Sequence, residues 1–169
     1  HLHRDSVQYT VVPLHLNSGF GVCFPGMAVT ASTMVLRQRF SLKHFWDDVR
    51  KYNVEYFIGV GEMCRYLYNL PPRDDDGDTT LKTVMANGML GILVEPFKNR
   101  FKLDNLVEIY GNTEGMGGTL NYEEKPGMCG NLILEGLRMG EVVQCNFVTE
   151  ELVHNEDGWV VKCQPGETG

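Results

Sequence analysis

Short β-rich runs alternate with amphipathic segments along the first two thirds of the chain. Runs typical of strands occur at residues 7–12, 33–36, 54–58, 81–86 and 106–110. Apolar residues recur at helical spacing in the intervening segments, at residues 42–49, 62–70 and 90–101. Strands separated by helices indicate βαβ units. The pattern therefore predicts an α/β fold with a mainly parallel sheet and flanking helices.

Capping and helix-breaking residues predict where the helices begin and end. Ser41 is a candidate N-cap for the first helix. Pro71 and Pro72 stop the second helix, because proline lacks the amide that a helix interior needs. The third helix is expected to begin near Glu95 and Pro96.

The pattern changes after Gly118. Glycines recur there, and short β-rich runs follow at residues 141–143 and 158–161. We therefore predict that residues 1–124 are part of an α/β domain and that residues 125–169 begin a small antiparallel β unit. The chain has no initiator methionine and stops at a turn-like segment, so we expect an internal piece of a longer protein.

Composition narrows the possible partners. The 169 residues are 43% hydrophobic with a net charge of −7, as in an ordinary globular protein. Without a basic cluster the chain is a poor candidate for nucleic-acid binding, although backbone amides and a metal can still bind a nucleotide locally. No signal peptide and no apolar run near the ~20 residues of a membrane span is visible. The five cysteines contain no CxxC pair, and we interpret them as reduced thiols of an intracellular protein.

The strongest candidate for chemistry is the segment 110–115, directly after a predicted strand. Ligands of open α/β sheets bind beyond the carboxyl ends of the strands. Tyr110 offers a flat face for a base, and Gly111 allows close approach of the backbone. Thr113 offers a hydroxyl to a phosphate oxygen, and the carboxylate of Glu114 suits Mg²⁺. A plain glycine turn with a solvated glutamate explains the same residues, so chemistry alone leaves both interpretations open.

Two further segments could line the same crevice. Asn87 and Gly88 follow the preceding strand; Asn87 could read a base edge, but an Asn-Gly pair is foremost a turn former. His15 follows the first strand, where a structural histidine is the simpler interpretation. The acidic run at residues 74–78 lacks the glycine position and the final glutamate of an EF-hand, so we predict a solvated loop. The sequence contains no Walker-type loop and no specific nucleophile motif.

Several segments together resemble one family. The segment 110–115 resembles the YGxTEG motif of the acyl-adenylating, or AMP-binding, superfamily. Residues 61–72 resemble the GELCRYLxNxPP segment of very-long-chain acyl-CoA synthetases, also called fatty-acid transport proteins. Residues 40–53 are similar to their FSxxxFWDDxxKYN, residues 86–89 to their GNGL, and residues 163–169 to their CQPGExG. The matches occur in order along nearly the whole chain.

The resemblance implies a fragment of an ATP-dependent fatty acyl-CoA synthetase, from the large N-terminal domain. In such enzymes a fatty acid and ATP give an acyl-adenylate, and coenzyme A then displaces AMP. Thr113 and Glu114 would be catalytic, with Glu114 holding Mg²⁺. Nucleotide contacts would come from Asn87, Gly88, Tyr110, Gly111, Asn112 and Thr113, and acyl-substrate contacts from His15, Met89 and Gly115.

The chain also departs from the family pattern. The motif PLYHSAG corresponds to residues 13–19, which places His15 at the tyrosine and Leu16 at the usual histidine. The phosphate-binding loop and the C-terminal lysine of the family are expected outside this chain, so we predict that the isolated chain is inactive. The alternatives are an adenylating relative with another carboxylic acid, or a non-catalytic binding module. The resemblance also implies membrane association through segments outside this chain, at the endoplasmic reticulum, peroxisome or plasma membrane.

Overall fold

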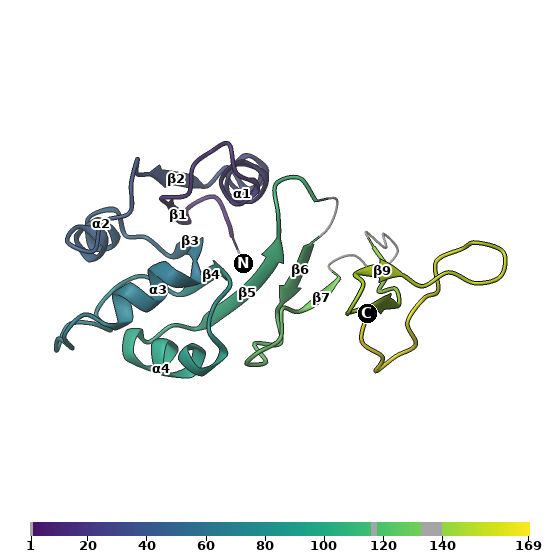
Figure 1. Cartoon of the computed structure of the whole chain (residues 1–169). Coiled ribbons are helices and arrows are strands. Elements are labelled where there is room, and N and C mark those ends of the chain that lie inside the picture. The colour runs from purple at the N-terminus through teal and green to yellow at the C-terminus, as the bar shows by residue number, and fades with distance from the viewer. Residues whose placement is uncertain (1, 116–117, 133–139) are drawn as a thin grey trace. The chain divides into compact units, whose positions relative to one another are not determined.

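The computed structural model describes residues 2–115, 118–132 and 140–169 (Figure 1). Two compact units make up the chain, His1–Ile133 and Leu134–Gly169. Within the described ranges, none of the helices has the length and apolar character needed to cross a lipid bilayer.

The first unit is built on one seven-stranded sheet, with the order β2-β1-β3-β4-β5-β6-β7. The first five strands in this order run parallel, and β6 and β7 are antiparallel additions at one edge. Their bounds are β1 Val7–Thr10, β2 Thr33–Leu36, β3 Tyr56–Val60, β4 Thr83–Asn87, β5 Asn105–Gly111, β6 Gly118–Asn121 and β7 Asn131–Leu132. The predicted mainly parallel α/β fold is confirmed.

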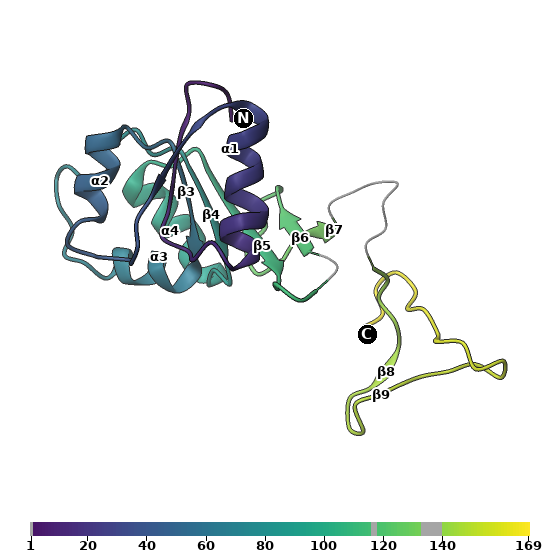
Figure 2. The same cartoon turned by 90° about the horizontal axis from the view of Figure 1, so that it is seen from above.

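Helices cover both faces of this sheet (Figure 2). The helices α2 (Phe45–Tyr52), α3 (Gly61–Tyr68) and α4 (Gly91–Phe101) share one face, and the π-helix η1 (Asn17–Cys23) leads into α1 (Phe24–Thr30) on the other. Tyr9 points to the first face, where its ring lies 5.7 Å from that of Phe45. Its neighbour Gln8 points to the opposite face and donates a hydrogen bond of 2.9 Å to Ser32, just after α1.

The core lies between the sheet and α2, α3 and α4. Tyr9, Phe57, Val84 and Leu106 are in register across β1, β3, β4 and β5, and none of them is more than 2% exposed. Side chains one helical turn apart, such as Cys64 and Leu67 in α3, cover this row. The alternation of the strands and the period of the helices thus account for one continuous core.

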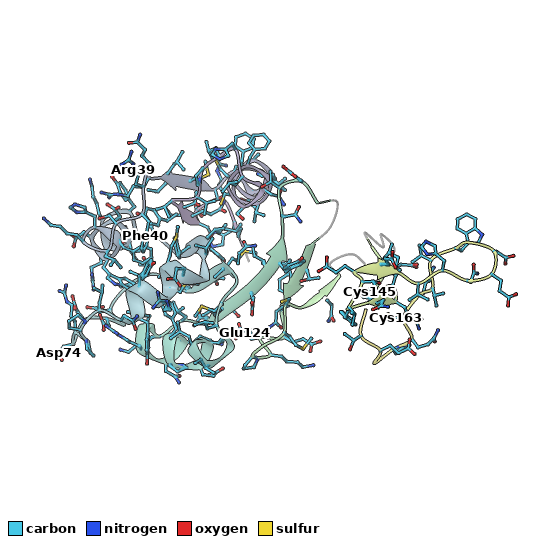
Figure 3. The ribbon with its side chains drawn as sticks, viewed as in Figure 1. Arg39, Phe40, Asp74, Glu124, Cys145 and Cys163 are labelled. Carbon is cyan, nitrogen blue, oxygen red and sulfur yellow. The ribbon has the colours of Figure 1, made fainter. Side chains whose placement is uncertain are left out.

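The hairpin between β6 and β7 is attached to this core through Glu124 (Figure 3). The carboxylate of Glu124 accepts a hydrogen bond of 3.0 Å from the Leu106 amide and forms an ion pair with Lys98 of α4. Thr119 of β6 pairs with Leu132 of β7, so one sheet extends beyond residue 125. The boundary at residues 124 and 125 between parts of the parent protein stays a prediction.

Two predicted helix starts are wrong. The helix α4 begins at Gly91, and Pro96 lies inside it. Burial of Leu93 and Val94 in the first turn explains the early start, because it outweighs the cost of about 3 kcal/mol for an interior proline. The helix α2 has His44 as its N-cap, whereas Ser41 contributes only its carbonyl, which accepts a hydrogen bond from the Phe45 amide at 3.0 Å.

The helical segment formed by η1 and α1 was not predicted. Its glycines and Pro25 read as loop residues. A Cβ on Gly19 would lie 2.5 Å from the carbonyl oxygen of Pro13, so the glycine permits a close backbone approach. Pro25 is tolerated because it stands in the first turn of α1. The chain therefore forms a helical segment where the local sequence pattern predicts none.

The second unit is a small antiparallel β structure, as predicted. It contains the two-stranded sheet of β8 (Cys145–Asn146) and β9 (Glu151–Leu152). Isolated bridges join Val143 to Lys162 and His154 to Val160. The strand-like runs at residues 141–143 and 158–161 contribute these bridges rather than continuous strands.

Candidate functional site

Three loops with polar residues leave the carboxyl ends of strands in the first unit. They are the loop after β1, the turn after β4 and the turn after β5. The strands β4 and β5 are neighbours, and β1 is separated from β4 by β3 alone. All three strands run parallel, so their loops emerge at the same edge of the sheet, where open α/β folds bind ligands.

The turn after β5 presents its side chains to solvent. Asn112, Thr113 and Glu114 are exposed and, with Gly115, line an open hollow of about 490 Å³. Tyr110, at the end of β5, is 62% exposed, which leaves much of its ring free for stacking. No hydrogen bond or ion pair joins Glu114 to another described residue of the chain. The turn thus has a base-sized aromatic face, a hydroxyl and a carboxylate within five residues.

The turn after β4 is shaped by two glycines. Gly88 has a φ of 68°, a left-handed conformation that favours glycine. Gly61, at the start of α3, approaches it so closely that a Cβ there would lie 2.3 Å from the Gly88 carbonyl oxygen. Asn87 remains half-buried, whereas Met89 is only 4% exposed and belongs to the core. The proposed substrate contact of Met89 stays a prediction.

The loop after β1 approaches the turn after β5. His15, Asn17 and Thr113 line one hollow of about 300 Å³, together with Leu14, Leu16, Phe20 and Gly21. His15 is exposed there. The structure therefore brings together two candidates, His15 and Thr113, that are 98 residues apart in the sequence.

Two hydrogen bonds connect these three loops. The backbone amide of Asn17 donates to the Thr113 hydroxyl at 3.2 Å. The Ser18 hydroxyl donates to the side-chain oxygen of Asn87, also at 3.2 Å. Sequence reasoning missed both Asn17 and Ser18. The available signal was their position directly after His15, just beyond a predicted strand.

The acidic run is not a solvated loop throughout, and in this respect the prediction is wrong. Asp76 is 7% exposed and accepts a hydrogen bond of 2.7 Å from Nε of Arg100. It also accepts one of 3.0 Å from the Arg73 amide. Asp74 is exposed at the outer end of the loop (Figure 3). Among the described residues, no group of three or more potential ligands is arranged to hold a metal.

The two buried cysteines are unsuited to nucleophilic chemistry. All five are free thiols, and Cys23 and Cys64 are buried. Burial raises the pKa of Cys64 to about 12, so its reactive thiolate form is negligible at neutral pH. Burial also raises the pKa of Cys23, the cysteine closest in sequence to Ser18.

The parallel sheet with three polar loops at its carboxyl edge defines a ligand-binding α/β unit. Residues 1–153 match the family model for AMP-binding enzymes. The chain therefore belongs to the AMP-binding enzyme family.

Known relatives agree with the resemblance in the sequence. The chain is 34% identical to long-chain fatty acid transport protein 2 of Rattus norvegicus, over 99% of this chain and 27% of that protein. It is 36% identical to long-chain fatty acid transport protein 5 of Homo sapiens, over 98% of this chain and 24% of that protein. The chain thus spans about a quarter of the length of these relatives.

Solved structures agree with the fold. A benzoate CoA ligase from Burkholderia xenovorans matches with a TM-score of 0.71 and 16% identity, over 98% of this chain and 32% of that one. ATP-bound MatB from Rhodopseudomonas palustris matches with a TM-score of 0.71 and 17% identity, over 98% and 30%. A fatty acyl CoA synthetase from Mycobacterium tuberculosis matches with a TM-score of 0.67 and 16% identity, over 95% of this chain and 30% of that one.

Proposed function

We propose that the chain is part of an ATP-dependent fatty acyl-CoA synthetase that activates long or very long chains. One observation carries the proposal: in a chain of the AMP-binding family, the three motif-bearing loops share one edge of the sheet and are connected by hydrogen bonds. The names of the long-chain fatty acid transport proteins support the substrate class. The ATP-bound state of MatB supports the nucleotide.

In the proposed reaction, a carboxylate oxygen of the fatty acid attacks the α-phosphorus of ATP. The bond to the bridging oxygen breaks, and pyrophosphate leaves with its electron pair. The sulfur of coenzyme A then attacks the acyl carbon and gives up its proton to solvent, the bond from that carbon to the phosphate oxygen breaks, and AMP leaves with the electron pair. In the first step this chain would bind and orient the substrates. The residues that line its two hollows include polar side chains but no strong base, so a role in proton abstraction is not assigned to them.

The exposed side chains suit distinct parts of the nucleotide. The ring of Tyr110 would stack near the adenine, with Asn87 and the Gly88 backbone as a second wall. The Thr113 hydroxyl accepts from Asn17 and keeps its own hydrogen for a phosphate oxygen. Gly111 and Asn112 would shape the turn between base and phosphate. The acyl side would be formed by His15, Met89 and Gly115.

Glu114 fits a role as ligand to Mg²⁺. Its carboxylate is exposed on an open hollow and has no ion pair with another described residue. Mg²⁺ in nucleotide sites is typically held by one or two carboxylates together with phosphate oxygens and water, so a single carboxylate is sufficient. The metal would neutralise phosphate charge in the first step.

The test is pyrophosphate release by the full-length protein with ATP and a long-chain fatty acid. We expect Glu114→Gln to lower the rate about 100-fold or more, because the substitution removes the metal-binding charge. Glu95→Gln is the matched control, since Glu95 is exposed on α4. Release that is unaffected by Glu114→Gln would contradict the assignment. Absence of release by the wild-type protein would favour a non-catalytic binding module.

A panel of acids tests the substrate class. We expect long and very long fatty acids to support release better than bile acids or aromatic acids. The isolated 169-residue chain should show no release above its Glu114→Ala variant, since the remaining phosphate-binding groups are proposed to lie elsewhere in the protein. Because such fatty acids partition into lipid, we also propose membrane association of the full-length protein through segments outside this chain.

A further inference from the structure

The first two residues of η1 contact both nucleotide-facing turns at once. Asn17 holds the Thr113 hydroxyl through its backbone amide, and Ser18 holds the Asn87 side chain through its hydroxyl. Each bond is 3.2 Å long. The contacts join segments that are 96 and 69 residues apart in the sequence, so only the tertiary fold could reveal them.

The backbone around Ser18 is held in place by the wide turn of the π-helix. The Phe24 amide donates to the carbonyl of Gly19, and the Cys23 thiol donates to the carbonyl of Ser18 at 3.1 Å. Gly19 in turn packs against Pro13, where a Cβ would lie 2.5 Å from the carbonyl oxygen. The Ser18 hydroxyl therefore extends from a segment of backbone that is held in place by these contacts.

The hydrogen bond from Ser18 constrains which polar groups the Asn87 side chain can present to a base. An asparagine side chain has a carbonyl oxygen on one branch and an amino group on the other, and rotation by 180° exchanges them. A hydroxyl that donates to the oxygen selects one of the two orientations. Asparagine pairs with the N6 amino group and N7 of adenine through these two branches, whereas guanine offers two acceptors at the same edge.

We propose that Ser18 is a positioning residue that fixes the side-chain amide of Asn87 for recognition of adenine. This inference rests on the proposed function, since it assigns Asn87 to the base of ATP. The family motif PLYHSAG has alanine at the position of Ser18, so the hydroxyl is not part of that motif. Base selectivity would therefore depend on a residue that departs from the family motif.

The experiment measures equilibrium binding of ATP and of GTP to the full-length protein by calorimetry. We expect Ser18→Ala to weaken ATP binding about fivefold, as for the loss of one orienting hydrogen bond, and to leave GTP binding within about twofold. Ser18→Thr keeps the hydroxyl and should restore most of the ATP preference. Ser41→Ala is the matched control, because Ser41 lies before α2 and lines neither hollow of the site.

A double substitution tests whether Ser18 acts through Asn87. In the Asn87→Ala background, Ser18→Ala should cause no further loss of ATP affinity. Additive losses, or equal losses for ATP and GTP, would overturn the inference. Pyrophosphate release is measured on the same samples: ATP binding with the expected coupling but without release would leave the Ser18 inference standing and overturn the proposed ligase activity. A protein that binds no ATP would overturn both.

Discussion

The acidic loop at residues 73–80 and the turn at residues 112–115 look alike in sequence, since both are polar and carry carboxylates. The structure separates them. In the loop, Asp76 is buried against Arg100, and Asp75 pairs with Arg50. In the turn, Glu114 is exposed and has no ion pair with any described residue. The loop uses its charges for the fold, whereas the turn leaves its charge available to a ligand.

The comparison teaches that the density of charged residues does not mark a site. What distinguishes the turn is its place at the carboxyl end of a buried parallel strand, together with a carboxylate, that of Glu114, which has no partner among the described residues. The following predictions test this division between structural and functional polar residues.

Arg100→Met should cause the largest loss of stability, about 3–5 kcal/mol, because it leaves Asp76 buried without its partner. Arg100 also donates to the carbonyls of Tyr68 and Pro71, so the substitution removes three contacts. Urea denaturation can be followed by the fluorescence of Trp46, which stacks on Phe101 with ring centroids 4.6 Å apart. A Trp159→Phe background removes the second tryptophan.

The control for Arg100 is Arg73→Met. The Arg73 side chain is 65% exposed in its pair with Asp75, so the change should cost less than about 1 kcal/mol. Replacing both members of the buried pair, as in Asp76→Leu with Arg100→Met, should be less damaging than Arg100→Met alone. If Arg100→Met and Arg73→Met lowered the free energy of unfolding by the same amount, the buried pair would not have the structural role assigned to it.

Gly61→Ala should cost about 1–3 kcal/mol, because the new Cβ would meet the Gly88 carbonyl 2.3 Å away and neither backbone can rotate aside. The same clash should weaken ATP binding by the full-length protein, since it displaces the turn that carries Asn87. Gly140→Ala is the matched control, because a Cβ there would meet no atom of a described residue within 4 Å. A fully stable Gly61→Ala variant with unchanged ATP affinity would show that this close approach is dispensable.

These differences show how much of the molecule the sequence could predict. The mainly parallel fold, and the positions of the polar turns directly after strands, followed from β-rich runs and helical spacing. The helix beginning at Asn17 did not, because Gly19 permits a close approach to the Pro13 backbone rather than a turn. Nor did the burial of Asp76, since its partner Arg100 is 24 residues away. Ser18 was missed for the same reason: its significance is a contact with Asn87, and no local pattern encodes it.

Glu108→Gln should have a smaller, pH-dependent effect. Glu108 is 8% exposed on β5, and burial raises the pKa of its carboxyl. The folded state therefore keeps the proton to higher pH than the unfolded state, and the free energy of unfolding falls as the pH rises through this interval. At pH 7 the glutamine variant should be more stable by less than about 1 kcal/mol.

The pH series decides whether this effect belongs to Glu108. Below the unfolded-state pKa of the carboxyl, both the glutamate and the glutamine are neutral, so the two proteins should unfold at the same urea concentration. The exposed Glu95→Gln variant should show no such convergence. A stability difference that is constant with pH would mean that packing, rather than the buried charge, distinguishes the variants.

Glu114→Ala should have the smallest effect on stability, below about 0.5 kcal/mol, while it strongly lowers pyrophosphate release by the full-length protein. Its carboxylate is exposed and makes no hydrogen bond or ion pair to another described residue, so unfolding loses nothing when it is removed. Urea denaturation and the activity assay on the same variant give the two values. A loss of stability as large as that of Arg100→Met would mean that the turn is structural, and the division between the two acidic segments would fail.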